Sequence, residues 1–373
     1  MRELLETYVE DGTVPGAVAL LARGDDVDVV AVGSLDVEGT APMARDSIFR
    51  IASLTKPITA AALLMLVEDG RIAVDDPIGT WLPELAAPMV VRTPQSPVDD
   101  VVPARRPITV LDLLTGCAGY GWPSDFALPA VHALRTVQTD GREVALRPEP
   151  DEWLARLARI PMLYQPGEAF LYDTCSDLQG ILIARASGLP LPQFLAERMF
   201  TPLGMRDTGF MVPAAQRHRF TSYYRRSADG LVLGDGPDGQ FSRLPAFPEG
   251  SGGLVSTVDD WFRFARMLLD GGGGLLSPES VRQMTTDHLT DAQRAVGTLF
   301  LNGQGWGYGG SVDLVAADPW NVPGRYGWVG GSGTSGYIVP DRGTVSILFT
   351  QVGVDSPVPI TLLEEFWLLS ADL

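Results

Sequence analysis

The sequence predicts an α/β protein of the α+β kind, with one antiparallel sheet built from both chain ends and flanked by helices. Strand patterns lie near both ends, at 17–22, 28–32, 335–339 and 344–351. Helical patterns fill the middle of the chain. We therefore expect a sheet domain formed by 1–74 and 251–373, and a mostly helical lobe over 75–250 with insertions that shape a pocket at the seam.

The first part of the chain supplies a helix, a hairpin and a buried helix. Residues 2–11 have the amphipathic pattern of a helix, and Gly24-Asp25-Asp26 predicts the turn between the first two strands. The pattern over 53–67 is apolar on nearly every side and ends at Gly70, which suits a helix C-cap. A helix that is apolar all round is expected to lie inside the protein.

The middle and the end of the chain alternate between short segments and helices. Seven prolines interrupt the chain between residues 77 and 107, and 205–250 is polar and rich in glycine without a clear period. Helices are predicted at 110–114, 152–159, 176–187, 192–200, 258–269 and 360–369, with another starting at Pro278. Asp341-Arg342-Gly343 predicts the turn between the last two strands.

Composition limits the possible partners. The chain has 46 acidic and 28 basic residues, a net charge of -18, which argues against binding nucleic acid or anionic membranes through a basic surface. The longest apolar run, 58–67, is too short to cross a bilayer, and the first residues lack the pattern of a secretory leader. Cys117 and Cys175 are expected to be reduced core residues. We expect a cytoplasmic protein whose oligomeric state the sequence leaves open.

One stretch carries the chemistry. Lys56 is the only lysine, since 27 of the 28 basic residues are arginine. An ammonium can lose its proton and act as a base, whereas a guanidinium stays protonated. Ser53 lies three residues earlier, and positions three apart share one face of a helix. A surface lysine near a capping serine is the plain alternative, so the pair needs further support.

Three motifs supply that support through a resemblance. Ser53-Leu54-Thr55-Lys56 resembles the first motif of the penicillin-recognising serine hydrolases. Gln165 to Thr174 is similar to the Pro-Gly run that leads into Tyr-x-Asn in that family, and Gly327 to Gly333 to its Lys-Thr-Gly or His-Thr-Gly segment. The family includes class C β-lactamases, D-Ala-D-Ala carboxypeptidases, D-aminopeptidases and β-lactamase-like esterases. The resemblance covers nearly the whole chain and implies a β-lactamase-like fold.

The resemblance also implies roles for individual residues. Ser53 would be the nucleophile, and Tyr172 would share the proton of Ser53 with Lys56 and pass it to the leaving group. The backbone N–H groups of Ser53 and Gly331 would stabilise the oxyanion. Burial and the positive end of the helix dipole both disfavour an ammonium, so we expect Lys56 to be neutral at neutral pH.

Two departures from the family pattern concern the substrate. Thr174 stands where the family has Asn, so a hydroxyl replaces the amide that would bind an acyl side-chain carbonyl. Trp328 stands where Lys or His would pair with a substrate carboxylate. An indole in this position favours apolar or aromatic groups, as in the esterase branch. Together with Val329 and Gly330, these residues are the expected substrate-binding positions.

No cofactor or metal is expected. Gly331 to Gly336 fits the dinucleotide pattern G-x-G-x-x-G, but a strand rather than a helix is predicted to follow it. The histidines, His132, His218 and His288, are far apart in the sequence and have no metal-ligand spacing. The expected partner is therefore a small-molecule ester or amide substrate.

The sequence thus predicts a serine hydrolase that forms an acyl-enzyme on Ser53, with carboxylesterase activity on small or apolar esters favoured over amide or peptide hydrolysis. The alternatives in the same class are an amidase or D-aminopeptidase and a β-lactamase-type enzyme. An acyltransferase would differ only in the acceptor of the acyl group. A ligand-binding sensor that keeps the fold without catalysis is the alternative from another class.

Overall fold

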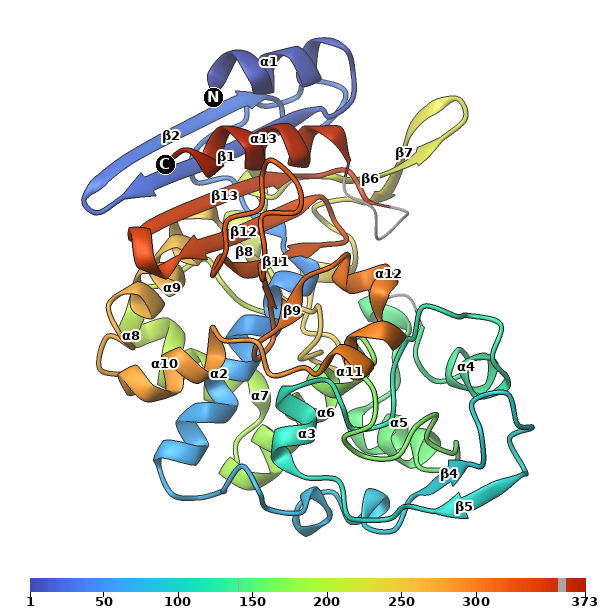
Figure 1. The fold of residues 1–373 in the computed structure, drawn as a ribbon. Coiled ribbons are helices and arrows are strands. Elements are labelled where there is room, and N and C mark those ends of the chain that lie inside the picture. Colours follow the sequence, from blue (N-terminus) through green and yellow to red (C-terminus); the bar gives the residue numbers. More distant parts are fainter. Residues whose placement is uncertain (140, 355–359) are drawn as a thin grey trace.

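A computed structural model describes residues 1–139, 141–354 and 360–373 (Figure 1). Its main element is an antiparallel sheet with the strand order β2-β1-β13-β12-β11-β10-β9. These strands are β1 (Gly16–Arg23), β2 (Asp26–Gly33), β9 (Gly305–Trp306), β10 (Ser311–Val312), β11 (Tyr326–Gly330), β12 (Thr334–Val339) and β13 (Thr344–Thr350). The first strand pairs with the last, which confirms the expected sheet built from both chain ends.

Helices cover both faces of this sheet and form the lobe beside it (Figure 1). They are α1 (Arg2–Glu10), α2 (Thr55–Glu68), α3 (Val110–Leu114), α4 (Pro129–Leu134), α5 (Pro150–Leu157), α6 (Thr174–Ser187), α7 (Leu191–Leu195), α8 (Thr201–Leu203), α9 (Val258–Leu269), α10 (Pro278–Met284), α11 (Asp291–Val296), α12 (Thr298–Leu301) and α13 (Thr361–Ala371). The two chain ends lie close together on the outer side of the sheet.

Alternation along the strands explains the two layers. On β1, Ala17 and Ala19 face a core shared with α1 and α13, while Val18 and Leu20 face the larger core that contains α2 and α9. Residue 336 on β12 must be glycine, because a Cβ there would lie 2.6 Å from the ring of Trp261 on α9. The sheet therefore separates an outer layer, α1 and α13, from an inner layer that carries α2.

Three short antiparallel pairs complete the fold. They are β3 (Phe49–Arg50) with β8 (Val255–Ser256), β4 (Met89–Val91) with β5 (Val101–Pro103), and β6 (Tyr223–Ser227) with β7 (Gly230–Asp235). The β6–β7 hairpin falls in the range assigned to the helical lobe, yet Tyr224 bridges to Val352 at the end of β13. The division of the chain at residues 74 and 251 stays a prediction.

The structure differs from the expected elements where segments are short. The strands expected at the two ends begin and end within two residues of the observed ones, whereas β9, β10 and β11 were not expected as strands. The motif from Gly327 therefore lies on β11 and the following turn, directly before the expected strand, which is β12. Two-residue strands and a glycine-rich strand carry too few apolar positions to show a period of two. The helix expected to start at Ser53 starts at Thr55, after a 3-10 turn over Ala52–Leu54.

Phe349 on β13 joins the sheet to the segment that leads into α2. Its ring is fully buried and packs edge-on against Phe49 on β3, with 5.7 Å between the ring centroids. We expect Phe349→Ala to lower the free energy of unfolding by about 3–5 kcal/mol, because it removes a large buried ring and leaves a cavity. Urea unfolding followed by circular dichroism measures this change.

The matched control is Leu368→Ala on α13, whose side chain is 47% exposed. This change should alter the free energy of unfolding by no more than about 0.5 kcal/mol. Equal effects of the two substitutions would contradict the assignment of Phe349 to the core that supports the start of α2.

Candidate active site

Ser53 lies in the 3-10 turn that connects β3 to α2, and hydrogen bonds from the sheet hold this turn. Ile51 N–H donates to Leu254 O at 3.1 Å, and Thr334 Oγ1 on β12 donates to Ile51 O at 3.1 Å. Ala52 adopts a φ of 43°, a left-handed conformation that is costly for a residue with a side chain. The backbone just before Ser53 is therefore fixed by β12 and by Leu254, the residue directly before β8.

Lys56, in the first turn of α2, contacts Ser53 directly. Its Nζ lies 2.9 Å from Ser53 Oγ, 2.7 Å from Ser251 O and 2.7 Å from Asp173 Oδ1. Only 1% of the lysine is exposed. The three protons of an ammonium thus have three oxygen acceptors. The expected proximity of Ser53 and Lys56 is present in the structure.

Tyr172 approaches Ser53 from the other side. Its hydroxyl donates to Ser53 Oγ at 2.9 Å and accepts a hydrogen bond from Trp328 Nε1 at 2.8 Å. The backbone of Tyr172 is paired with Trp122 through two hydrogen bonds of 2.9 Å, and its ring stacks on Phe300 with 4.5 Å between centroids. Ser53, Lys56, Tyr172 and Trp328, which come from distant parts of the sequence, therefore form one hydrogen-bonded cluster.

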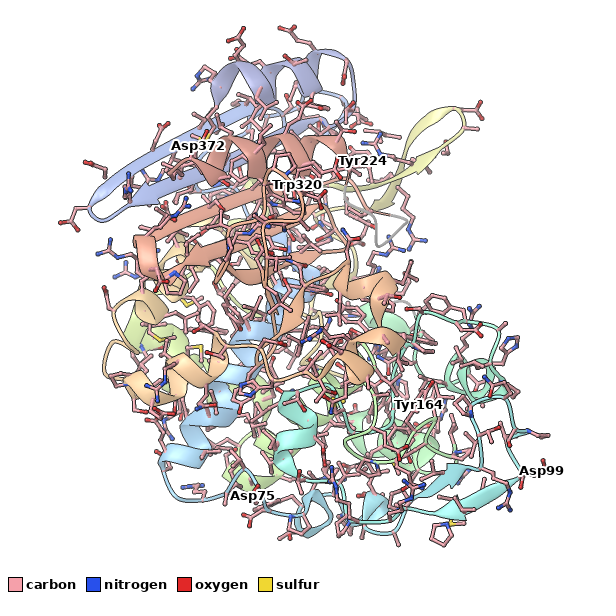
Figure 2. The ribbon with its side chains drawn as sticks, viewed as in Figure 1. Asp75, Asp99, Tyr164, Tyr224, Trp320 and Asp372 are labelled. Carbon is pink, nitrogen blue, oxygen red and sulfur yellow. The ribbon has the colours of Figure 1, made fainter. Side chains whose placement is uncertain are left out.

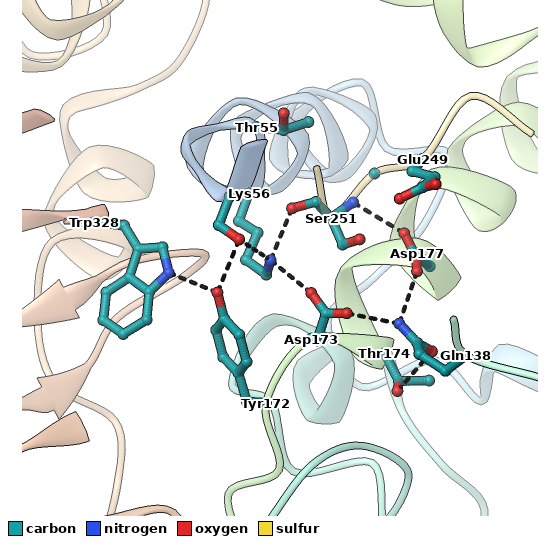
Figure 3. Close-up of polar contacts among 12 residues, drawn as sticks. Thr55, Lys56, Gln138, Tyr172, Asp173, Thr174, Asp177, Glu249, Ser251 and Trp328 are labelled. Atoms are coloured by element: carbon teal, nitrogen blue, oxygen red, sulfur yellow. Dashed lines mark hydrogen bonds and ion pairs between the residues drawn. The ribbon is translucent and has the colours of Figure 1, made fainter. Parts of the chain in front are cut away.

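A closed ring of contacts holds Ser251 O and Asp173 Oδ1, two of the three oxygens around Lys56 Nζ (Figure 3). Gln138 Nε2 donates to Asp173 Oδ2 at 2.7 Å and to Asp177 Oδ2 at 3.2 Å. Asp177 Oδ1 accepts from the backbone N–H of Ser251 at 3.0 Å, and Ser251 O accepts from Lys56. The ring returns to Lys56 through Asp173. Both oxygens are therefore fixed by partners that do not themselves touch Ser53.

The ring continues into a buried set of charges. Arg147 Nη1 lies 2.7 Å from Asp177 Oδ2, and Arg147 Nε lies 2.9 Å from Glu249 Oε1, with all three side chains fully buried. Burial raises the pKa of Glu249 well above its ordinary value, which Arg147 does not offset. Arg147 thus pairs with Asp177 and lies beside Glu249, whose raised pKa favours the uncharged acid. An uncharged Glu249 reduces the number of buried charges that need a partner.

The protonation state of Lys56 corrects the expectation from the sequence. Burial alone would lower the pKa of Lys56, but the nearby Asp173 carboxylate and the other anionic partners raise it above its ordinary value. Asp173 shows the matching effect: burial opposes its ionisation, yet Lys56 and Arg147 lower its pKa. Lys56 is therefore an ammonium in the resting site, not the neutral amine that we expected. The sequence argument omitted the charge of Asp173.

Thr174 also differs from the expectation. Its side chain is fully buried and donates to Gln138 Oε1 at 3.0 Å, away from the space in front of Ser53. Asp173 adopts a φ of 84°, and this turn places Thr174 at the start of α6 while Asp173 faces Lys56. The residue that touches the lysine is thus the one directly after Tyr172, which sequence reasoning missed. A carboxylate next to the tyrosine in a chain with one lysine was the available signal.

Gly330 and Gly331 lie on β11 and the turn that follows it. A Cβ at Gly330 would lie 2.3 Å from Ile51 O, so only glycine lets β11 approach the segment before Ser53 this closely. A Cβ at Gly331 would meet open space. Within the described residues, neither Ser53 N–H nor Gly331 N–H donates to a protein acceptor. Both remain candidate oxyanion donors.

Two cavities meet at Ser53. The first, which we call the aromatic cavity, has a volume of about 280 Å³ and is lined by Ser53, Phe300, Trp320, Trp328, Val329, Gly330, Gly331, Arg325, Tyr337 and Trp367, among others. The second cavity, of about 520 Å³, shares Ser53, Tyr172 and Gly331 and adds Trp122, Arg135 and Gln138. A substrate with two arms around a reacting carbon can therefore place one arm in each cavity.

Other expectations concern metals, thiols and membranes. Across 1–139, 141–354 and 360–373, the structure has no group of three or more His, Cys, Asp or Glu side chains able to hold a metal ion. Cys117 and Cys175 are free and buried, and burial raises the pKa of each thiol to about 12. No helix in the described part of the chain has the length and apolar character needed to cross a bilayer. Gly331 to Gly336 covers the turn after β11 and the first residues of β12, so a strand and not a helix follows this turn, as its surroundings in the sequence indicated.

The architecture is that of a β-lactamase-like protein, with an antiparallel sheet from both chain ends and a Ser-x-x-Lys motif that leads from a 3-10 turn into a buried helix. Residues 1–361 match the Beta-lactamase family, and the chain belongs to that family. This result confirms the resemblance on which the sequence-based expectations depend.

Relatives span nearly the whole chain. An uncharacterized protein of Mycobacterium tuberculosis is 38% identical over 336 residues, which cover 87% of this chain and 82% of that protein. Esterase EstB of Burkholderia gladioli is 33% identical over 373 residues, covering 93% and 89%. The solved structure of EstCE1, a hydrolase with promiscuous acyltransferase activity, superposes with a TM-score of 0.82 at 25% identity and covers 99% of this chain and 96% of its own.

The single lysine makes its protonation state directly measurable. In protein labelled with ¹⁵N-lysine, the one Nζ resonance should remain that of an ammonium at pH values where the side chain of free lysine has already lost its proton, because Asp173 raises the pKa of Lys56. In Asp173→Asn the carboxylate is lost while the side chain keeps its shape. The titration midpoint of Lys56 should then fall.

Asp259→Asn is the matched control, because Asp259 pairs with Arg45 on the surface. The titration curve of Lys56 in this variant should coincide with that of Lys56 in the unchanged protein. A Lys56 resonance that titrates near neutral pH in the unchanged protein would restore the neutral amine and contradict the role given to Asp173.

Proposed function

We propose that this protein is a serine hydrolase that forms an acyl-enzyme on Ser53 and acts as a carboxylesterase on small or apolar esters. One observation carries the proposal: Ser53 Oγ lies 2.9 Å from both Lys56 Nζ and Tyr172 Oη, at the junction of two cavities. A serine becomes a useful nucleophile when a neighbouring group removes its proton. Both candidate acceptors are within hydrogen-bond distance.

The active form needs one proton fewer on Lys56 and Tyr172 together. Ser251 O and Asp173 Oδ1 can only accept hydrogen bonds, so a neutral Lys56 would donate its two N–H groups to them and direct its lone pair at Ser53 Oγ. The raised pKa of Lys56 means that the amine holds this extra proton in the resting site and releases it when the active form arises. Lys56 then accepts the Ser53 proton, and the Tyr172 hydroxyl passes a proton on to the leaving group.

The reaction follows from this arrangement. Ser53 Oγ forms a bond to the ester carbonyl carbon as its proton passes to the Lys56–Tyr172 pair. The oxyanion accepts hydrogen bonds from the N–H groups of Ser53 and Gly331. The bond from that carbon to the alcohol oxygen then breaks, and the alcohol leaves with the proton held by the pair. Water repeats the sequence in reverse, giving up a proton to the pair, releasing the acid and returning Ser53.

The surroundings of Ser53 favour esters over substrates with a carboxylate beside the scissile bond. Trp328 offers no charge, and its only N–H is already donated to Tyr172. Aromatic side chains form much of the aromatic cavity, which suits apolar groups. The names of two relatives, Esterase EstB and the hydrolase EstCE1, agree with this preference.

Acyl transfer is the second candidate, and the second cavity supports it. An alcohol bound there would lie beside the same Ser53 and compete with water for the acyl group. EstCE1 is described as having promiscuous acyltransferase activity. Analysis of the products formed from an ester with and without added alcohol distinguishes transfer from hydrolysis. Amide hydrolysis and ligand binding without turnover predict a different result in the experiments below.

The first experiment uses Ser53→Ala. The unchanged protein should hydrolyse p-nitrophenyl butyrate and bind a fluorophosphonate probe covalently at Ser53, and the variant should do neither. Mass spectrometry of the labelled peptide locates the adduct, and Ser280→Ala on α10 serves as the control that keeps both properties. Absence of labelling and of ester and amide turnover in folded, unchanged protein would contradict the proposal and favour a non-catalytic binding protein.

Lys56→Arg tests the need for a removable proton. Arginine keeps the positive charge but stays protonated, so kcat/KM should fall by about 10²–10⁴-fold, the usual contribution of acid–base catalysis. Thermal unfolding verifies that the variant is folded, and Arg243→Lys, a change of cation on the surface, should leave the rate unchanged. A Lys56→Arg variant with full activity would remove Lys56 from the proton path.

Trp328→Phe tests the hydrogen bond from the indole to Tyr172. The ring is kept in part while the N–H that lies 2.8 Å from Tyr172 Oη is lost. One hydrogen bond contributes about 0.5–1.5 kcal/mol, so kcat should fall roughly threefold to tenfold. Trp320→Phe, which lies in the same cavity without touching Tyr172, is the comparison. Equal losses in the two variants would assign the effect to cavity shape instead.

A further inference from the structure

Arg325 is a buried cation at the aromatic cavity that the proposed reaction does not use. It lies directly before β11, is 3% exposed and lines the cavity that begins at Ser53. Its guanidinium carbon lies 4.5 Å from the ring centroid of Tyr337 and 5.6 Å from that of Trp367. An arginine held between aromatic rings keeps its N–H groups in a fixed plane.

The hydrogen bonds of Arg325 are incomplete. Its Nε lies 2.9 Å from Asp313 Oδ2, but neither Nε nor Nη1, both buried, makes a hydrogen bond of good geometry within the described residues. Buried donors normally have partners, and leaving one without costs about 1–3 kcal/mol. Nearby polar groups are already engaged: Gln304 Nε2 donates to Asp313 Oδ1 at 2.6 Å. A group that enters the cavity with an oxygen acceptor would satisfy this donor.

The cavity connects Ser53 with Arg325 around the edge of β11. β10 pairs with β11 only at Tyr326 and Gly327, so the edge from Trp328 to Gly330 has no neighbouring strand among the described residues. Trp328 belongs to the inner core that contains α2, whereas Tyr337 and Trp367 belong to the outer core under α13. The cavity contains residues of both cores. It therefore passes from the face that carries Ser53 to the face covered by α13.

The loop between β10 and β11, which contains Trp320, covers the part of the cavity that is lined by Trp367. Trp320 lies in front of the strands, near α13 (Figure 2), and its ring centroid is 6.5 Å from that of Trp367. Trp367 Nε1 donates to Ser335 Oγ at 2.8 Å, so this indole presents only its apolar ring. An occupant of this region is thus surrounded largely by apolar rings, and Arg325 is the charged side chain among the lining residues, beside the amide side chains of Asn302, Gln304 and Asn321.

We propose that the aromatic cavity binds an apolar chain of the ester substrate that ends in an uncharged oxygen acceptor, such as a ketone carbonyl, and that this oxygen accepts a hydrogen bond from Arg325. The inference depends on the proposed esterase activity and specifies its substrate class. Asp313 is also fully enclosed and already balances the charge of Arg325. A second carboxylate would add a net negative charge to a buried site, so a neutral acceptor is favoured.

The experiment compares p-nitrophenyl esters of one chain length with different ends: heptanoate, 6-oxoheptanoate and the monoester of heptanedioate. A mirror series of acetates carries the same three ends on the alcohol, followed by acid release at constant pH. In one of the two series, kcat/KM for the ketone end should exceed that for the methyl end by about tenfold. This is the effect of one well-placed hydrogen bond. The series that shows it identifies the acyl or the alcohol arm.

The variant Arg325→Gln/Asp313→Asn tests the assignment without leaving a buried carboxylate unpaired. Within this variant, the kcat/KM for the ketone-ended ester divided by that for the methyl-ended ester should fall to about one. Arg243→Gln, on the surface, should keep the ratio of the unchanged protein. Thermal unfolding verifies that both variants are folded, and a ratio taken within one variant does not depend on a general loss of activity.

Three results would overturn the inference. They are equal rates for ketone and methyl ends in both series, a preference for the carboxylate end, and a ketone preference that survives in the double variant. Hydrolysis of the esters without any ketone preference would leave the proposed esterase activity intact. Failure to hydrolyse any ester of either series would instead count against the esterase activity itself.

Discussion

The contact between the Lys56 ammonium and the Asp173 carboxylate is the constraint on which the site depends. A buried cation is tolerated only when anions and acceptors surround it, and removing one partner of such a pair commonly costs about 3–5 kcal/mol. Asp173, Ser251 and Ser53 supply the three acceptors. They come from the start of α6, from the segment before β8 and from the turn before α2. The Lys56 ammonium thus holds three distant parts of the chain together. The position of Ser53 Oγ follows from these contacts of Lys56 Nζ.

The same network stores conformational strain near the reacting atoms. Among the described residues, Ala52, Asp173 and Asn302 are the non-glycine residues with positive φ, and all three line one of the two cavities at Ser53. Each such conformation costs about 1–3 kcal/mol and persists only where the surroundings fix it. Asp173 is held by Lys56 and Gln138, and Ala52 by the hydrogen bonds that the preceding Ile51 makes with Leu254 and Thr334. Rigid backbone at these positions suits a site that must hold hydrogen-bond donors in place before the substrate arrives.

Long periodic segments and the Ser-x-x-Lys spacing made much of this arrangement predictable from the sequence. The strands at both ends have enough residues to show alternation, and the apolar pattern after Ser53 correctly indicated a buried helix. The roles of β9 to β11 were hidden because strands of two residues have no period and β11 contains glycines. The charge of Lys56 was misjudged because burial is visible in a sequence, whereas the carboxylate that outweighs it is brought close only by folding. Thr174 was misplaced for the same reason, since a single dihedral angle at Asp173 decides which side chain faces the lysine.

Having only one lysine, and that one buried, affects the whole surface. An enzyme that handles activated acyl groups exposes its own nucleophiles to them, and exposed lysine amines are the side chains most readily converted to amides. Here the basic surface groups are guanidiniums, which stay protonated and do not attack esters. The side chains of this sequence therefore offer no exposed primary amine to a stray acyl donor. The proposed acyl chemistry would thus meet no lysine on the surface to modify, a consequence of composition alone.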